Sequence, residues 1–308
     1  MGEEARNCVV VLGPTASGKT ALGVRLAYAL GGEVISADSR QVYRGLDVGS
    51  GKDLEEYVVE GIPVPYHLID VVGLEQEFNV FEYQRRFFET FERLIERRVA
   101  PVVVGGTGLY LEAVLNGYRM VEAPVDCELR EELSTLSDEE LEARLRSLKP
   151  RVHNVTDLGD RDRTVRAIEI AEYSSGHEPE PAPDLRPLIF GTRWERAALH
   201  GRIAARLKER LNAGLIEEVE GLLAVGVGVE KLRSLGLEYR FVTDYVKGAI
   251  KNRNDLFQKL NVAIRNFAKR QETWFRRMER NGTEIQWIAE ADVERALEYA
   301  CAAFPNRA

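Results

Sequence analysis

The feature that most constrains the fold of this chain is a glycine-rich loop between an apolar run and an amphipathic stretch. Residues 13–20 read Gly-Pro-Thr-Ala-Ser-Gly-Lys-Thr, a G-x-x-x-x-G-K-T pattern. The apolar run Cys8–Leu12 precedes the loop, and a helical pattern ending near Leu30 follows it. In such a strand–loop–helix unit, backbone N–H groups and a helix N-terminus face bound phosphates. The residues predicted to surround these phosphates are Gly13, Thr15, Ala16, Ser17, Gly18, Lys19 and Thr20.

Two side chains of this loop add chemistry to the backbone cradle. Lys19 supplies a positive charge, and the hydroxyl of Thr20 can hold Mg²⁺. The full pattern in the correct context rarely arises by chance. The chain is therefore predicted to bind a di- or triphosphate.

Other short apolar runs, each bounded by turn residues, indicate further buried strands at Glu33–Ala37, Pro101–Val104 and Pro187–Gly191. A helical pattern covers Val80–Arg98, with Asn79 as its expected N-cap and Glu82 as the capping-box partner. Strands that alternate with helices predict an α/β fold, a P-loop NTPase-like parallel sheet core. Ligands bind at the carboxyl ends of such strands. The loops 13–20 and 38–43 are therefore expected to share one crevice.

The character of the sequence changes between about Val121 and Arg186. Strand-like runs disappear there, and charged helical stretches such as Ser137–Leu145 replace them. We predict a helical insertion domain at 121–186, within a core formed by 1–120 and 187–308. The core is expected to be mainly helical from Trp194 to about Arg280, and these C-terminal helices precede a short apolar run at Glu284–Ile288 and a last helix from Asp292.

Overall composition excludes several classes of protein. The 308-residue chain has a net charge of −8, which argues against binding nucleic acid over its whole surface but permits a local basic face. No apolar run approaches the ~20 residues that span a bilayer, and the acidic N-terminus has no signal-peptide core. Three cysteines lie too far apart to predict a disulfide framework or a zinc site. We expect a cytoplasmic protein with no membrane segment and, because no oligomerisation stripe is present, a monomer.

Polar residues follow two of the predicted strands. Asp38 comes directly after the second strand, where a carboxylate can hold Mg²⁺, accept a proton from a nucleophile, or simply cap a turn together with Ser39. The glycine loop Gly105–Tyr110 follows the third strand, and Thr107 offers a hydroxyl within it. A lone histidine, His67, is more often a structural hydrogen-bonding group than a catalyst.

Positive charge is concentrated in two helical segments. Between Lys259 and Arg280, seven Lys and Arg side chains are opposed only by Glu272 and Glu279. In a chain of net negative charge, this local reversal predicts a polyanionic partner. The segment Arg196–Arg210 carries three arginines at four-residue spacing, one of which could point into the phosphate crevice: Arg202, Arg206 and Arg210.

Taken together, these strings resemble the tRNA dimethylallyltransferase (isopentenyltransferase) family over nearly the whole chain. The phosphate loop is shared with many enzymes, whereas its combination with D-S-x-Q-V-Y at Asp38–Tyr43 and K-R-Q-x-T-W-F-R at Lys269–Arg276 is far more specific. The matching strings also include His67–Asp70, Gly105–Tyr110, Arg163–Glu169 and Tyr239-Arg240. One departure is Gly49–Asp53, which replaces the usual G-T-A-K-P.

The resemblance implies transfer of a dimethylallyl group from dimethylallyl diphosphate to N6 of adenosine 37, beside the tRNA anticodon. Asp38 matches the family's catalytic aspartate, and Thr107 matches the threonine where adenine and prenyl donor meet. Arg206, with Arg202 as the fallback, is assigned to the diphosphate leaving group together with Lys19, the loop amides and Mg²⁺ near Thr20. These charges are needed because negative charge builds on the leaving group.

The resemblance also assigns tRNA contacts, and the helical insertion is then expected to clasp the anticodon stem. The residues carried over are Ser39, Gln41, Arg163, Arg166, Tyr239, Arg240, Lys269, Arg270, Trp274 and Arg276. Two alternatives remain open. A small-molecule kinase would use the same loop on ATP, although no arginine-rich lid for a γ-phosphate is evident. A non-catalytic RNA-binding descendant would keep its cellular role after Asp38→Ala.

Overall fold

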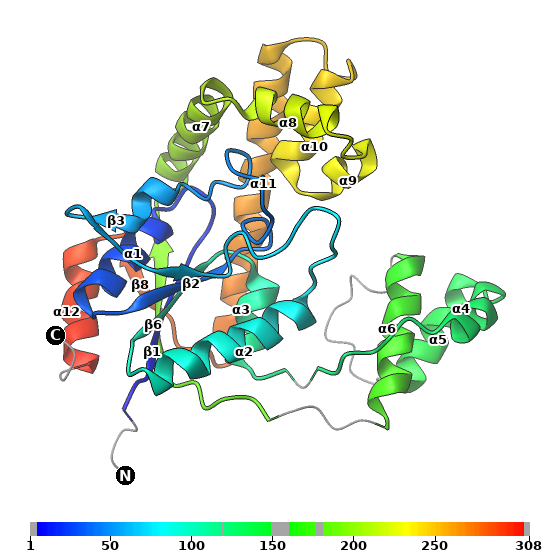
Figure 1. Ribbon diagram of the computed structural model, residues 1–308, viewed down its shortest axis with the longest axis horizontal. Helices are drawn as coiled ribbons and strands as arrows, with labels where there is room; N and C mark the ends of the chain where they lie inside the picture. The colour runs from blue at the N-terminus through cyan, green and yellow to red at the C-terminus, as the bar shows by residue number, and fades with distance from the viewer. Residues whose placement is uncertain (1–4, 119, 149–159, 177–180, 305–308) are drawn as a thin grey trace. The chain divides into compact units, whose positions relative to one another are not determined.

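The computed structural model describes residues 5–118, 120–148, 160–176 and 181–304. The chain divides into two compact units (Figure 1). The larger unit combines Met1–Asn116 with Pro183–Ala308, and the smaller unit is Gly117–Ala182. In the described parts of the chain, no helix is both long and apolar enough to cross a membrane.

A six-stranded parallel sheet forms the centre of the larger unit. Its strands lie in the order β5-β2-β6-β1-β7-β8, and their bounds are β1 Cys8–Leu12, β2 Glu33–Ala37, β5 Tyr66–His67, β6 Pro101–Gly105, β7 Pro187–Arg193 and β8 Gln286–Ala289. The α/β fold and the four strands predicted from apolar runs are confirmed. Those runs are continuous because side chains on both faces of the central strands are buried.

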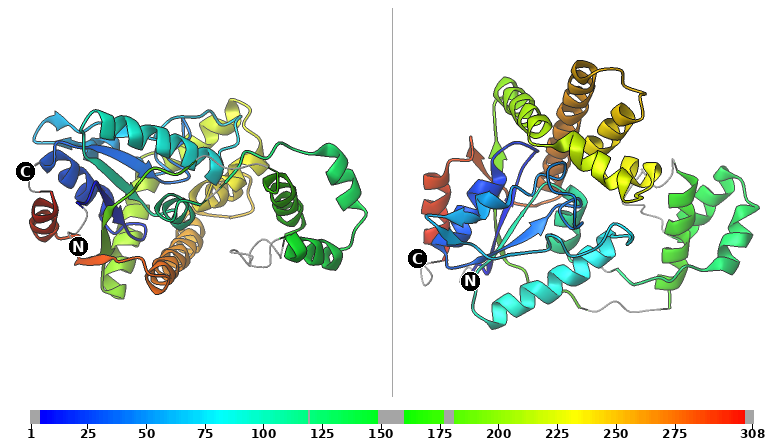
Figure 2. Two further views of the ribbon diagram at one scale, coloured as in Figure 1. Left: turned by 90° about the horizontal axis from the view of Figure 1, so that it is seen from below. Right: turned by 45° about the horizontal axis from the view of Figure 1, so that its top comes forward.

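Alternate residues of each strand point to opposite faces of the sheet, and each face has its own helices (Figure 2). Val9 and Val11 of β1 pack in one cluster with α1 (Lys19–Ala29) and α12 (Val293–Ala303). Cys8, Val10 and Leu12 pack in another with α2 (Val80–Glu96) and α3 (Gly108–Leu115).

The predicted N-cap of α2 is confirmed, because the backbone N–H of Glu82 donates to Asn79 Oδ1 at 3.0 Å. The Glu82 carboxylate pairs with Arg85 and Arg86 along the same helix. In a capping box, the Glu82 carboxylate would accept a hydrogen bond from the backbone N–H of Asn79. Here the carboxylate instead forms these ion pairs within the helix.

Five helices follow β7 and pack together through a separate apolar cluster (Figure 1). They are α7 (Arg196–Asn212), α8 (Leu215–Ala224), α9 (Val229–Ser234), α10 (Leu237–Val246) and α11 (Arg253–Arg280). Helix α11 has 28 residues, a length of about 42 Å. Its first half, including Leu256 and Leu260, packs among these helices. Its second half, including Phe275 and Met278, packs on the sheet. One helix thus joins both parts of the larger unit.

Between β2 and α2, the chain forms small elements that the apolar pattern did not predict. The 3₁₀ helix η1 (Leu54–Tyr57) is followed by β3 (Val58–Val59) and β4 (Ile62–Pro63), which form a small two-stranded sheet. The next strand, β5, lies at the edge of the main sheet. These elements are too short to leave a periodic signal.

The smaller unit contains α4 (Cys127–Ser134), α5 (Asp138–Leu148) and α6 (Arg161–Ser174). Its core is a small cluster formed by Leu129, Leu133, Leu141, Leu145 and Ile168. The buried carboxylate of Glu169 accepts hydrogen bonds from Arg130, Arg166 and the Asp126 backbone. Although burial raises its pKa, these hydrogen bonds outweigh that effect and lower the pKa to about 2.

Candidate functional site

The phosphate loop is held in shape by its glycines and by contacts with the neighbouring chain. Gly18 caps α1 with a φ of 83°, and Ala16 also lies in the left-handed region with a φ of 61°. A Cβ at Gly13 would collide with the Thr192 side chain, so this close approach requires glycine. Thr192 Oγ1 and Ser17 Oγ lie 2.6 Å apart, and Trp194 Nε1 donates to Ser17 O at 2.8 Å. Thr192 of β7 and Trp194, the residue after this strand, thereby support the loop.

Gln271 of α11 joins the two glycine loops. Its side-chain oxygen accepts from the Thr15 backbone N–H at 2.8 Å, and its amide nitrogen donates to Gly106 O at 2.8 Å. The side chain is buried. Because glutamine is both donor and acceptor, one residue satisfies a backbone group of each loop. The spacing between the loops at the ends of β1 and β6 is therefore fixed by α11.

Asp38 and Thr107 stand at the ends of the neighbouring strands β2 and β6. The Asp38 carboxylate accepts from the Arg40 backbone N–H at 2.9 Å. Thr107 Oγ1 accepts from the Ser39 backbone N–H at 3.1 Å, and the Thr107 backbone N–H donates to Ala37 O at 3.2 Å. These bonds fix the two side chains beside each other at the carboxyl edge of the sheet.

Two cavities meet at the phosphate loop. One of about 760 Å³ is lined by Lys52 and Asp53, and the other, of about 550 Å³, is lined by Asp38 and Thr107. Residues that line both cavities are Lys19, Thr20, Arg206 and Arg210. A ligand in this space would therefore have cations around one end and Asp38 near the other.

The electrostatic environment of the loop lysine is unusual. Burial lowers the pKa of Lys19 to about 8, and the nearby positive charge of Arg206 contributes in the same direction. The carboxylate of Asp38 opposes this shift. A site that holds several cations close together is prepared for an anion.

The structure separates the two arginines that the sequence left as alternatives. Arg202 Nε donates to Ala16 O at 2.8 Å, and its guanidinium lies 4.3 Å from the Trp194 ring centroid, so Arg202 braces the loop. Arg206 lines both cavities and forms an ion pair with Asp53. Of the two, Arg206 is the one placed in the space that both cavities share.

The predicted tRNA-contact residues of the larger unit fall into three groups. The Ser39, Arg240, Arg270 and Trp274 side chains belong to residues that line the second cavity, while Lys269 and Arg276 are exposed on α11. Gln41 and Tyr239 also line this cavity but are nearly buried. Gln41 donates to Gly51 O at 2.9 Å, and Tyr239 donates to Glu218 at 2.7 Å. These two side chains support the cavity wall.

Trp274 packs directly on the second glycine loop. A Cβ at Gly108 would lie 2.5 Å from the indole ring of Trp274. The guanidinium of Arg277, also on α11, lies 4.0 Å from the centroid of the same ring. Arg277 also donates to the buried Glu112 at 2.6 Å. The indole is thus held between the glycine loop and an arginine whose own position is fixed.

The two predicted contacts in the smaller unit differ in availability. Arg166 donates to Glu169 at 3.0 Å and to the backbone oxygen of Ala123 at 2.7 Å, so its guanidinium holds that unit together. Arg163 is 60% exposed and lies 3.7 Å from Asp160. Of these two side chains, that of Arg163 is therefore the more accessible to an RNA.

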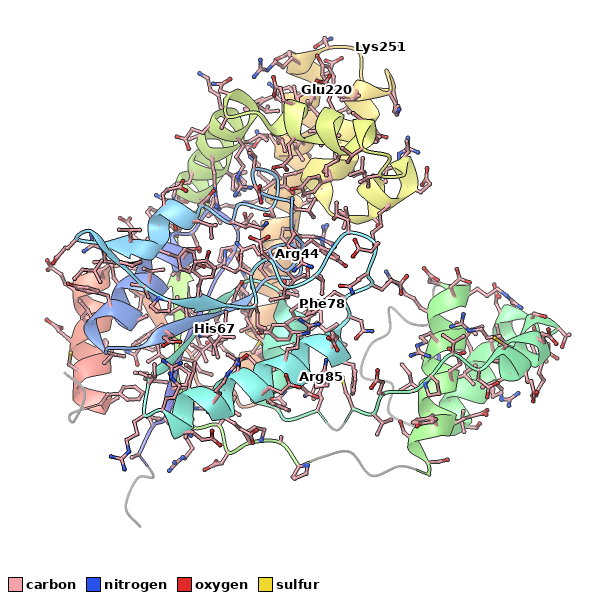
Figure 3. The ribbon with its side chains drawn as sticks, viewed as in Figure 1. Arg44, His67, Phe78, Arg85, Glu220 and Lys251 are labelled. Carbon is pink, nitrogen blue, oxygen red and sulfur yellow. The ribbon has the colours of Figure 1, made fainter. Side chains whose placement is uncertain are left out.

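His67 has a structural environment. Its Nε2 lies 2.7 Å from Glu33 Oε2, and Arg97 donates to the same carboxylate at 2.7 Å. It lies on the edge strand beside β2, well away from Glu220 in α8 and from Lys251 in the loop between α10 and α11 (Figure 3). The residue lines neither cavity.

Sequence reasoning missed the residues that shape the loop between β2 and η1. Glu218 accepts from the backbone N–H groups of Asp47, Val48 and Gly49 at 2.7–3.1 Å. Lys52 is 2% exposed and donates to Tyr43 O at 2.9 Å. Gln271 stands inside the matching string Lys269–Arg276, and Lys52 stands inside the divergent string Gly49–Asp53, so both positions could have drawn attention, whereas Glu218 carries no local signal.

Comparison with known proteins is consistent with this geometry. The sequence profile of the IPP transferase family matches residues 41–278, and that of isopentenyl transferases matches residues 6–66. The chain is 61% identical to tRNA dimethylallyltransferase 1 of Geotalea uraniireducens over 92% of each chain. It is 58% identical to tRNA dimethylallyltransferase 2 of Syntrophotalea carbinolica over 92% of this chain and 94% of the relative.

Solved structures give the same result. The full-length tRNA isopentenylpyrophosphate transferase from Bacillus halodurans is 29% identical, with a TM-score of 0.71 over 98% of each chain. A eukaryotic dimethylallyltransferase acting on tRNA shares the fold, with a TM-score of 0.80 at 20% identity over 99% of this chain and 81% of the other. With a family profile that covers most of the chain and relatives more than half identical, the chain belongs to the IPP transferase family.

Proposed function

We propose that this protein transfers a dimethylallyl group from dimethylallyl diphosphate to N6 of adenosine 37, beside the anticodon of a tRNA. The observation that carries the proposal is the meeting of two cavities at the phosphate loop, with Asp38 and Thr107 on one side. The relatives with 58–61% identity bear the name tRNA dimethylallyltransferase.

The residues suit the chemistry of prenyl transfer. N6 of the adenine forms a bond to the first carbon of the allyl group, and the bond from that carbon to the diphosphate oxygen breaks. The diphosphate leaves with the bonding electrons, and the proton lost from N6 goes to the carboxylate of Asp38. Lys19, Arg206 and the loop amides stabilise the charge that develops on the leaving group.

Mg²⁺ fits the donor set of the site. In the described parts of the chain, no group of three His, Cys, Asp or Glu side chains could hold a metal ion alone. Mg²⁺ prefers a few protein oxygens together with substrate phosphates, and the Thr20 hydroxyl borders both cavities. We propose that Thr20 and the diphosphate hold Mg²⁺, which neutralises part of the phosphate charge.

The second cavity is the proposed entry for the RNA base. The target adenosine must leave its stack to reach a buried donor, and the exposed Arg240 and Arg270 stand at this cavity to receive the adjoining phosphates. Lys269 and Arg276 extend the basic face along α11. We propose that the smaller unit, Gly117–Ala182, binds the anticodon stem through exposed side chains such as Arg163.

Every residue that lines the two cavities belongs to the larger unit. We propose that the protein acts as a monomer and that it acts on tRNA in the cytoplasm.

A direct transfer assay tests the proposal. The protein is incubated with labelled dimethylallyl diphosphate, Mg²⁺ and unmodified tRNA, and digested nucleosides are analysed for labelled adenosine. Asp38→Asn is expected to reduce transfer about 10²–10⁴-fold, the usual contribution of a general base, with donor affinity little changed. The exposed Asp184→Asn, which removes the same charge outside both cavities, serves as the control.

Absence of label in adenosine from the folded wild-type protein would overturn the proposal. Equal loss of donor affinity and rate in Asp38→Asn would instead assign Asp38 to the metal. A parallel titration with ATP addresses the kinase alternative, which predicts that ATP binds much more tightly than dimethylallyl diphosphate.

A further inference from the structure

One carboxylate in the first cavity has no place in the chemistry described above. Asp53 forms an ion pair with Arg206 and lies 3.7 Å from the Arg210 guanidinium. The side chains of Asp53 and Arg206 are each 28% exposed, and that of Arg210 is 12% exposed. Arg206, which is proposed to stabilise the diphosphate, and Arg210, which lines the same space, are therefore already paired with a protein anion.

The backbone around Asp53 is firmly held. Glu218 binds three successive backbone N–H groups from Asp47 to Gly49, and Gln41 donates to Gly51 O. Lys52 is buried and pairs with Asp47 and Asp70. Asp53 itself is the N-cap residue of η1 and has a φ of 43°. Because its loop is fixed by these bonds, the Asp53 carboxylate is a constant feature of the cavity wall, and the long arginine side chains are the parts able to move.

The electrostatics of the pair support a competition. Although burial raises the pKa of Asp53, the charges of Arg206 and Arg210 outweigh it and lower the pKa, so the carboxylate is ionised at neutral pH. A diphosphate in the same space requires the same guanidinium N–H groups. It also brings several negative charges toward the carboxylate. The protein anion and the ligand thus oppose each other at Arg206 and Arg210.

We propose that Asp53 is a built-in counter-ion that competes with the diphosphate for Arg206 and Arg210, and thereby weakens retention of the pyrophosphate product. The role rests on the proposed prenyl transfer, in which pyrophosphate is released at this site. In the empty site, Asp53 offsets the repulsion among Lys19, Arg206 and Arg210. After transfer, Asp53 forms its ion pairs with Arg206 and Arg210 again as pyrophosphate leaves the site.

The test compares the binding of inorganic pyrophosphate, with Mg²⁺, to the wild-type protein and to Asp53→Asn by titration calorimetry. Asparagine tolerates the positive φ at this position, so the loop is expected to keep its shape. We expect Asp53→Asn to bind pyrophosphate about tenfold more tightly, the effect of losing one partly exposed hydrogen bond between charged groups. Pyrophosphate should inhibit prenyl transfer more strongly by a similar factor.

The matched control is Glu60→Gln, which removes the same charge from an exposed side chain between β3 and β4, outside both cavities. Its pyrophosphate affinity is expected to change less than about twofold, since exposed charges are well screened. Restoring the carboxylate in Asp53→Glu should return the affinity toward that of the wild type.

The sign of the change separates the possible roles. A structural or metal-binding role for Asp53 predicts weaker pyrophosphate binding in Asp53→Asn, and that result, or an unchanged affinity, would overturn the proposal. An equal gain in Glu60→Gln would also overturn it, because the effect would then reflect total charge alone. Pyrophosphate binding requires no tRNA, so a failed transfer assay would remove the proposed function without altering this measurement.

Discussion

The lowered pKa of Lys19 predicts how donor binding depends on pH. In the free protein this pKa is about 8, because burial and the charge of Arg206 disfavour the ammonium form. A bound diphosphate places negative charge beside Lys19 and raises its pKa. Binding therefore takes up a proton at any pH between the two values. Donor affinity is expected to be constant below about pH 7 and to fall as the pH rises through 8.

The size of the effect follows from the protonated fraction of Lys19. With a pKa of about 8, this fraction falls from about nine-tenths at pH 7 to about one-tenth at pH 9, so the dissociation constant should rise about tenfold across that interval. Dimethylallyl diphosphate contributes little to this change, because the last pKa of a phosphate ester is near 6. Calorimetric titration of the donor without tRNA measures the affinity. Repeating it at pH 9 in two buffers of different ionisation enthalpy measures the proton uptake, expected to be close to one.

Lys19→Arg provides the matched control, since a guanidinium stays charged throughout this range. Its affinity is expected to be lower at pH 7 but nearly flat up to pH 9. Equal slopes for wild type and variant would show that another group titrates. A wild-type affinity that stays constant until about pH 10 would show that Lys19 has its ordinary pKa, and the account of the cation cluster would be wrong.

Two further variants test the role of α11. Gln271→Met keeps the side-chain volume but leaves the Thr15 N–H and the Gly106 carbonyl without their partner, at a cost of about 1–3 kcal/mol for each group. We expect a lower temperature of thermal unfolding and a weaker affinity for the donor. Unchanged donor binding would argue against the role of Gln271 in holding the two glycine loops together. Lys269→Ala combined with Arg270→Ala should weaken tRNA binding and flatten its salt dependence, by about 0.7 in logarithmic slope for each lost phosphate contact, while the distant Lys251→Ala should leave the slope unchanged.

The sequence predicted the sheet well because its strands are buried on both faces. Continuous apolar runs such as Cys8–Leu12 leave few alternatives once turn residues bound them. The phosphate loop was equally clear, because Gly13 and Gly18 meet steric demands that other residues do not. The segment from Leu54 to His67 was missed, since its 3₁₀ turn and two-residue strands are stabilised by tertiary contacts rather than by a local pattern.

Within the site, the sequence predicts charged groups better than the bonds between them. Asp38 and Lys19 are predicted from their residue types and positions, whereas Arg206 is assigned from the resemblance of its helix to the family. The pairing of Arg206 with Asp53 depends on how α7 packs beside the loop before η1, which no spacing along the chain encodes. The same holds for Glu218, whose three backbone partners lie about 170 residues away. A partly buried carboxylate on a helix becomes informative only when its partners are known.

Helix α11 connects the proposed RNA face with the donor cradle through adjacent residues. Arg270 is exposed and lines the second cavity, whereas Gln271, the next residue, holds Thr15 and Gly106 together. Successive helical residues point about 100° apart, so one turn of helix faces both the polyanion and the phosphate loop. Because the first half of α11 is anchored among α7 and α10 and the second half on the sheet, the helix cannot shift at Arg270 without moving Gln271. A tRNA that binds this face is therefore positioned by the same rigid helix that sets the spacing of the two glycine loops. The helix thus determines the position of the adenine nitrogen relative to the reacting carbon of the prenyl donor.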